Sequence, residues 1–234
     1  MTQPKVVSRE EWLEARKALL DKEKEVTRAR DMIAEERRKL PMVKVEKDYT
    51  FEGPNGSRLT LLDLFEGRRQ LIVRHYMFSP GAKEGCIGCS MQADSVGELS
   101  HMWARDTTFV MISRAPVADF TPFKERMGWN IPWYSSFGSD FNYDYEVSTE
   151  MGESPGVSAF YREGDDVFFT YSIFDRGGDI FKSFYNYLDI THLGRQEDQL
   201  DHPWDWWRFK DTYDSEESHG PGDNWWNGTR YQQA

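Results

Sequence analysis

The sequence predicts an α/β protein in which helices flank a central mixed sheet. Residues 71–78 (LIVRHYMF) and 107–114 are rich in β-branched and aromatic residues, as in buried strands, and a helical segment separates them. Strands joined through helices favour right-handed crossovers and a partly parallel sheet. A predicted hairpin at 157–172, with the turn Glu163-Gly164-Asp165-Asp166, adds an antiparallel edge. The 15% aromatic content supplies large side chains for a core.

Residues 8–40 are predicted to form one long helix. Ser8 and Glu11 have the spacing of a capping box, and Pro41 ends the segment. One apolar stripe recurs every seven residues and consists of Trp12, Leu19, Val26, Ile33 and Leu40. Because no second apolar seam accompanies it, we expect the stripe to pack on the rest of the chain or across a homodimer rather than form an isolated coiled coil.

The remaining elements complete the order strand, helix, strand, helix, short strand, hairpin, helix, which is the thioredoxin arrangement. The expected elements are a strand at 43–51, a short helix at 60–65, helices at 86–105 and 117–127, a short strand at 131–136, a loop-rich insertion at 137–153 and a closing helix at 178–190. We therefore expect a helical extension at 1–41, a thioredoxin-like domain at 42–192 and a Trp-rich tail at 193–234.

The tail carries five tryptophans, and part of it has the composition of a linker. The tryptophans are Trp204, Trp206, Trp207, Trp225 and Trp226, and the linker-like stretch is 214–223 (DSEESHGPGD). The rings are expected to cover apolar surface of the domain itself. Two alternatives are a cap over the active-site face and a surface that binds a partner.

Charge and composition limit the partners and the compartment. The net charge of -11 disfavours nucleic acids and anionic membrane surfaces, which attract basic proteins. The first residues lack the apolar region of an export signal, and no apolar stretch is long enough to cross a bilayer. We therefore expect a cytoplasmic protein, in which a purely structural disulfide is uncommon.

The two cysteines of the chain, Cys86 and Cys89, form a C-x-x-C pair between a predicted strand and a predicted helix. This spacing puts both sulfurs on one side of the first helical turn. The free N–H groups of a helix start favour a thiolate, and Cys86 lies closest to that end. We expect Cys86 to attack as the nucleophile and Cys89 to resolve the mixed disulfide.

Zinc binding, haem attachment and a purely structural role are the alternatives to a redox pair. A zinc site needs two further ligands, and only His75 and His101 lie in suitable segments. Covalent haem attachment needs a histidine directly after the second cysteine, where Ser90 stands. The plainest alternative is a pair of reduced cysteines that fill space in the core.

Several separate motifs, in order, resemble a bacterial thioredoxin-like family of unknown function that is related to the peroxiredoxin and alkyl hydroperoxide reductase branch. They are residues 6–31, VEKDYTFEGPNG (45–56), EGCIGCS (84–90), SRAP (113–116), IPWYSSFGSDFNYDY (131–145) and SPGVSAFYREG (154–164). The resemblance extends to about Tyr213. It implies the thioredoxin-like fold, and it implies a particular activity only weakly because a fold alone does not determine function.

The resemblance also directs attention to two residues near the pair. Peroxiredoxins carry Thr or Ser three residues before the reactive cysteine, whereas this chain has Lys83, which would favour the Cys86 thiolate while Glu84 would oppose it. Thioredoxin-like proteins set a cis-proline opposite the cysteines, and Pro155 is similar in placement. A cis Pro155 would offer its backbone to a substrate chain, and the alternative is an ordinary trans proline.

Two further polar residues are candidates for supporting roles. His75, inside the strand before the cysteines, is expected to be a hydrogen-bonded core side chain, with proton transfer to Cys89 as the alternative. Arg114 follows the second strand, at a carboxyl end where ligands bind in α/β sheets, and would bind a substrate anion or pair with a carboxylate.

The sequence thus predicts a thiol–disulfide oxidoreductase or thiol peroxidase that needs no organic cofactor and no metal. Its substrate would be a protein or small-molecule disulfide or a peroxide, and a reducing partner protein would regenerate the thiols. The competing function is a non-enzymatic binding module that keeps Cys86 and Cys89 as structural residues.

Overall fold

The computed structural model describes residues 3–150 and 152–214. The chain divides into two compact units, one comprising residues 1–41 and one that begins at Met42 and includes the described part of the tail. Trp225, Trp226 and positions 215–223 of the linker-like stretch lie outside the described residues.

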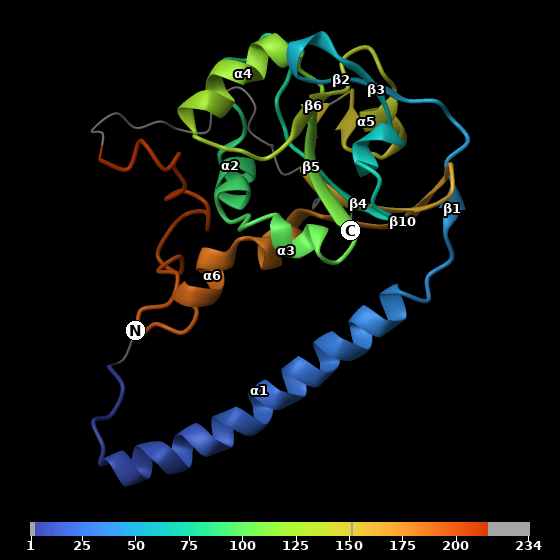
Figure 1. The fold of residues 1–234 in the computed structure, drawn as a ribbon. Helices are drawn as coiled ribbons and strands as arrows, with labels where there is room; N and C mark the ends of the chain where they lie inside the picture. Colours follow the sequence, from blue (N-terminus) through green and yellow to red (C-terminus); the bar gives the residue numbers. More distant parts are fainter. Residues whose placement is uncertain (1–2, 151, 215–234) are drawn as a thin grey trace. The chain divides into compact units, whose positions relative to one another are not determined.

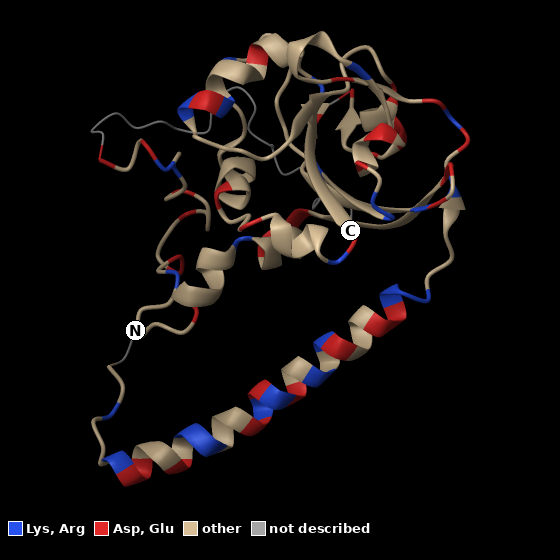
Figure 2. Ribbon diagram, viewed as in Figure 1, with Lys and Arg blue, Asp and Glu red and all other residues tan. Residues whose placement is uncertain are grey.

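The first unit contains the single helix α1 (Arg9–Arg37). The predicted capping box is confirmed, since Ser8 Oγ accepts from the backbone N–H of Glu11 at 3.2 Å and Glu11 Oε2 accepts from that of Ser8 at 2.9 Å. Charges of both signs follow one another along the helix (Figure 2), and none of its residues is buried. The helix ends three residues before the predicted end, so Leu40 lies beyond it. The apolar stripe is exposed, and what covers it stays a prediction.

The second unit is built on an eight-stranded sheet with the order β1-β10-β9-β4-β5-β6-β2-β3. The strands are β1 (Val43–Lys44), β2 (Thr50–Glu52), β3 (Arg58–Thr60), β4 (Gln70–His75), β5 (Thr107–Ser113), β6 (Trp133–Ser135), β9 (Gly156–Glu163) and β10 (Asp166–Phe174). Strand β4 pairs in parallel with β5 and antiparallel with β9, and β10 continues the antiparallel side. This is the predicted thioredoxin-like fold. Strands β7 (Ser148–Thr149) and β8 (Gly152–Glu153) form a separate small hairpin.

Short helices cover both faces of the sheet. The α-helices are α2 (Ile87–Asp94), α3 (Ser100–Trp103), α4 (Val117–Arg126), α5 (Phe141–Asp144) and α6 (Ser183–Leu188), and the 3-10 helices are η1 (Pro54–Gly56), η2 (Asp63–Phe65) and η3 (Asp175–Phe181). Figure 1 shows α2 and α4 on one side of β5 and α5 on the other. In the described residues, no helix is long and apolar enough to cross a membrane.

Alternation along the strands creates two separate hydrophobic cores. In β5, Phe109 and Met111 enter the core that includes residues of α2 and α4, whereas Val110 and Ile112 enter the core beside α5. Successive side chains of a strand point to opposite faces. In β4 the same rule puts Arg74 on the α2 face and His75 on the α5 face.

Three predicted elements differ from the structure. The strand at 43–51 is two strands, β1 and β2, that lie in different parts of the sheet. The helix at 86–105 ends at Asp94 and resumes at Ser100, since Ser95, Val96 and Gly97 are poor helix formers. The closing helix begins only at Ser183, after a 3-10 segment that contains Gly177 and Gly178.

The insertion at 137–153 contributes a core residue that its loop-like sequence hides. Phe141 is 0% exposed and contacts the rings of Tyr49 and Phe51, whereas Phe137 is 60% exposed. We expect Phe141→Ala to lower the free energy of unfolding by about 3–5 kcal/mol, because it removes a buried ring and leaves a cavity. Urea unfolding measures this, with Phe137→Ala as the control that should change it by less than about 0.5 kcal/mol. Equal effects of the two substitutions would contradict this packing.

Candidate functional site

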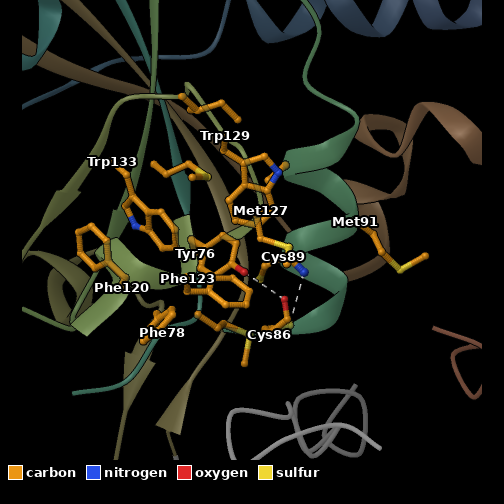
Figure 3. Packing of buried hydrophobic residues seen from close by; sticks show 14 of the residues in the cluster. Tyr76, Phe78, Cys86, Cys89, Met91, Phe120, Phe123, Met127, Trp129 and Trp133 are labelled. Atoms are coloured by element: carbon orange, nitrogen blue, oxygen red, sulfur yellow. Dashed lines mark hydrogen bonds between the residues drawn. The ribbon is translucent and has the colours of Figure 1, made fainter. Parts of the chain in front are cut away.

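The cysteine pair lies where the chain leaves β4 and begins α2. Cys86 is the N-cap of α2, and its Sγ accepts a hydrogen bond from the backbone N–H of Cys89 at 3.4 Å. The backbone N–H of Cys86 donates to the carbonyl oxygen of Met77 at 3.1 Å, which ties the helix start to the segment after β4. Figure 3 shows this turn beside the rings of Tyr76 and Phe123, with the hydrogen bond from Tyr76 to the Cys86 carbonyl dashed.

Both cysteines are free thiols, and Cys86 Sγ is hydrogen-bonded to the backbone of Cys89. Cys86 is 8% exposed and Cys89 is 1% exposed, so Cys86 is the more accessible sulfur. Both line a pocket of about 180 Å³. The pair is therefore buried but is not sealed in hydrocarbon, and one small-molecule-sized opening reaches both residues.

The negative charge of the pair is favoured on Cys89. The pKa of Cys86 is raised, because its thiol donates a hydrogen bond to Cys89 and because it is buried. Burial alone would raise the pKa of Cys89 as well, but the hydrogen bond from Cys86 and the charge of Arg74 outweigh it and lower this pKa to about 6. A backbone hydrogen bond from Met77 and the charge of Lys182 act in the same direction. This reverses the order expected from proximity to the helix start.

Cationic and aromatic side chains form the wall of the pocket. Arg74, from the end of β4, is 4% exposed, and its Nη1 donates to the carbonyl oxygen of Gly156 at 2.9 Å. Lys182 is buried between η3 and α6, where its Nζ lies 3.1 Å from Asp179 Oδ1 and 4.0 Å from the centre of the Trp207 ring. The charges of Arg74 and Lys182 both favour a thiolate at Cys89.

The tail supplies the ring that covers the middle of the C-x-x-C motif. A Cβ atom on Gly88 would lie 2.5 Å from Cζ3 of Trp207, so only glycine accommodates this ring. The indole Nε1 of Trp207 donates to Tyr185 Oη at 3.0 Å, which fixes its orientation against α6. Trp204 also lines the pocket, and Trp206 packs on the adjacent core. These tail tryptophans thus cover apolar surface of the domain, and that surface includes the cysteine face.

Pro155 precedes β9 and lines the same pocket as the cysteines. It does so because β9 begins opposite the end of β4, with Gly156 paired to His75. Its peptide bond with Ser154 is trans, so the cis alternative is wrong.

The structure does not bring Lys83 or His75 to the sulfurs. Lys83 is exposed and is absent from the pocket wall. The His75 ring lies on the α5 face, where Nε2 is 2.8 Å from Ser158 Oγ and the ring packs near Phe141. Burial and the neighbouring Arg74 lower the His75 pKa to about 3, so the ring is neutral. This is the position of a core histidine rather than of a proton relay to Cys89.

Arg114 lies outside the pocket and forms an ion pair, with 2.7 Å between its Nε and Oε1 of the buried Glu153. Arg114 also donates a hydrogen bond to Tyr143 Oη, and its guanidinium lies over the face of the Tyr143 ring. Arg114 was expected either to bind a substrate anion or to pair with a carboxylate, and its geometry fits the second role.

No group of three or more His, Cys, Asp or Glu side chains in residues 3–150 and 152–214 has the arrangement of a metal site. His75 and the exposed His101 therefore do not complete a zinc site with the cysteines in this part of the chain.

Sequence reasoning missed two residues of the site, Arg74 and Lys182. Arg74 has a detectable signal, because a charged residue inside the apolar segment LIVRHYMF is costly to bury without a function. Lys182 reaches the pocket only through the path of the chain after β10, which the local sequence does not reveal. Trp207 was among the tail tryptophans for which a cap over the active-site face was one alternative.

The different pKa values of the two thiols lead to a prediction for the pH at which the reduced protein ionises. We expect ultraviolet titration of the reduced protein to show one thiolate that appears with a midpoint near pH 6, as the Cys89 pKa requires. Cys89→Ser should remove this transition. Cys86→Ala should move it to higher pH, because the hydrogen bond from the Cys86 thiol is lost. A single midpoint near the ordinary thiol value of about 8.5 would contradict this charge distribution.

The contact between Gly88 and Trp207 generates a second prediction. We expect Gly88→Ala to lower the free energy of unfolding by about 1–3 kcal/mol, since the added methyl group forces the ring to move. The same substitution should speed the reaction of the thiols with an alkylating reagent. Gly97→Ala is the matched control, because nothing lies within 4 Å of a Cβ atom there. Unchanged stability and thiol reactivity in Gly88→Ala would show that Trp207 does not cover the pair.

Comparison with solved structures finds peroxidoxin BcpB of Mycobacterium tuberculosis at 17% identity and a TM-score of 0.47, covering 62% of this chain and 94% of that one. A putative protein disulfide isomerase of Bacteroides thetaiotaomicron is 16% identical with a TM-score of 0.43, covering 63% and 91%. No curated protein matches the sequence significantly. A family model, described as a bacterial protein of unknown function, matches residues 1–213. The chain therefore belongs to the DUF899 family of bacterial proteins.

Proposed function

We propose that this protein is a thiol–disulfide oxidoreductase that acts through Cys86 and Cys89. The observation that carries the proposal is the pair of free thiols at the start of α2, both of which line a pocket with a buried arginine in its wall. Cys86 is the attacking residue because it is the more exposed sulfur. Cys89 lies one turn deeper and resolves the intermediate.

The reaction begins with the proton on Cys86 and the negative charge on Cys89. As Cys86 Sγ attacks a substrate disulfide, its proton passes along the hydrogen bond to Cys89, one substrate thiolate leaves, and a mixed disulfide forms. The leaving thiolate takes the proton from Cys89. The Cys89 thiolate then attacks Cys86 Sγ, which releases the second substrate thiolate and leaves a Cys86–Cys89 disulfide. The substrate gains two electrons and the pair loses two.

The substrate is a protein or small-molecule disulfide, and a reducing partner protein restores the thiols in the cytoplasm. Pro155 lines the pocket together with both cysteines, so a substrate bound at the sulfurs would lie beside it. A homodimer through the α1 stripe remains part of the proposal, since these apolar side chains are exposed on the helix.

Substitution of each cysteine tests the proposal. With glutathione disulfide and the reduced protein, we expect Cys89→Ser to stall as a mixed disulfide, detected as added mass on Cys86, because the resolving thiol is absent. Cys86→Ser should reduce the disulfide no faster than buffer. Glutathionylation of Cys89 in the Cys86→Ser variant at the wild-type rate would reverse the two roles.

Hydrogen peroxide distinguishes the peroxidase form of the same chemistry. A thiol peroxidase would be oxidised rapidly by peroxide, and Cys89→Ser would then accumulate a sulfenic acid on Cys86. Slow oxidation by peroxide together with rapid reaction with disulfides supports the oxidoreductase.

A binding module is the competing function, and the low exposure of both sulfurs favours it. It predicts that neither Cys86→Ser nor Cys89→Ser changes any turnover and that the reduced thiols keep ordinary pKa values. Either catalytic result described above would exclude it.

A further inference from the structure

Arg74 is a buried cation without a carboxylate partner in the described part of the chain. Its side chain donates to the carbonyl oxygen of Gly156, and its Nε has no hydrogen-bond partner among residues 3–150 and 152–214. Within the same residues, no acidic side chain forms an ion pair with Arg74. A buried guanidinium is costly unless an anion compensates it, so the site must supply a negative charge.

Two of the three acidic residues of the pocket wall have other partners. Asp179 Oδ1 pairs with Lys182 at 3.1 Å, and Glu197 accepts a hydrogen bond from Trp206 at 2.8 Å. Asp175 is the third acidic residue of this wall. The cysteine pair lines the same pocket as the guanidinium, and the charge of Arg74 favours the thiolate at both sulfurs.

We propose that Arg74 stabilises the reduced, singly ionised form of the Cys86–Cys89 pair and so makes its disulfide form an oxidant of thiols. This inference rests on the proposed function and favours the reverse of the reaction written there: the protein disulfide is the oxidant, and the thiol substrate itself takes the place of the reducing partner protein. The disulfide form carries no charge, so it leaves the buried guanidinium uncompensated, whereas reduction restores a thiolate beside it. A disulfide whose reduced form is stabilised in this way has a higher reduction potential.

The corresponding reaction is balanced with thiols as the reductant. The Cys86–Cys89 disulfide, two substrate thiolates and one proton give the protein pair, as one thiol and one thiolate, and a substrate disulfide. Two electrons pass from the substrate sulfurs to the pair. The substrate class is therefore a dithiol, or two thiols, that become oxidised, and Arg74 is a positioning residue that acts through the sulfurs.

Equilibration against glutathione tests the role of Arg74. The protein is incubated at a series of ratios of reduced to oxidised glutathione, quenched with acid and an alkylating reagent, and the reduced fraction is read by mass spectrometry. We expect Arg74→Met to shift the equilibrium about tenfold towards the protein disulfide, which corresponds to about 30 mV for a two-electron couple. Arg74→Lys should remain close to the wild type, because it keeps the charge.

Arg176→Met is the matched control, since Arg176 lines the same pocket with an exposed side chain. Its equilibrium constant should stay within about twofold of the wild type, because solvent screens its charge. If Arg74→Met does not fold, Arg74→Gln replaces it, since the amide keeps a donor for Gly156 without the charge. A folded neutral variant with the wild-type constant would overturn the inference.

The wild-type protein gives a readout that needs no variant at Arg74. Above pH 6, reduction of the disulfide should take up one proton rather than two, because Cys89 remains a thiolate. Uptake of two protons near neutral pH would contradict the inference. A pair that forms no disulfide at any glutathione ratio would instead refute the proposed function, so the two failures are distinguishable.

Discussion

The backbone hydrogen bond from Cys86 to Met77 is the constraint on which the rest of the site depends. It holds the first turn of α2 against the segment that leaves β4, so the end of the central strand and the start of the helix cannot separate. A second hydrogen bond, from Ala115 to the carbonyl of Phe78, ties the chain after β5 to the same segment. Because both parallel strands end here, the cysteines, the strand arginine and the start of β9 converge without any loop that must close over them.

The alternation of side chains along β4 then determines which of its polar residues lies in the pocket with the cysteines. Arg74 and His75 are neighbours in sequence, but the pleat sends the arginine to the α2 face and the histidine to the α5 face. Histidine is the usual proton carrier near neutral pH, yet here its ring is neutral and bonded to Ser158. In the proposed reaction, a permanent charge therefore favours the thiolate, and the proton moves between the two sulfurs themselves.

The sequence predicted the strands that carry the site and the position of the cysteine pair, because these depend on local patterns. The alternation of β5, the capping box at Ser8 and the motif before α2 are all readable within short windows. The relative acidity of Cys86 and Cys89 was not readable, because it depends on charges from β4 and from Lys182, far away in the sequence. The function of Phe141 as a core residue was hidden for the same reason, since its partners come from β2 and the segment before it.

The described part of the tail forms part of the pocket that holds the cysteines. Trp207 lies against Gly88 and under the ammonium of Lys182, and its indole is bonded to Tyr185, so α6 and the tail form one continuous wall of the pocket. Loss of that ring would widen the pocket and let more water screen the charge of Arg74, which acts most strongly at low dielectric. The family model extends to residue 213, beyond this wall. The glycine in the C-x-x-C motif thus leaves the space that the distant Trp207 ring fills, so the two residues depend on each other. A domain that ended at residue 192 would lack this tryptophan.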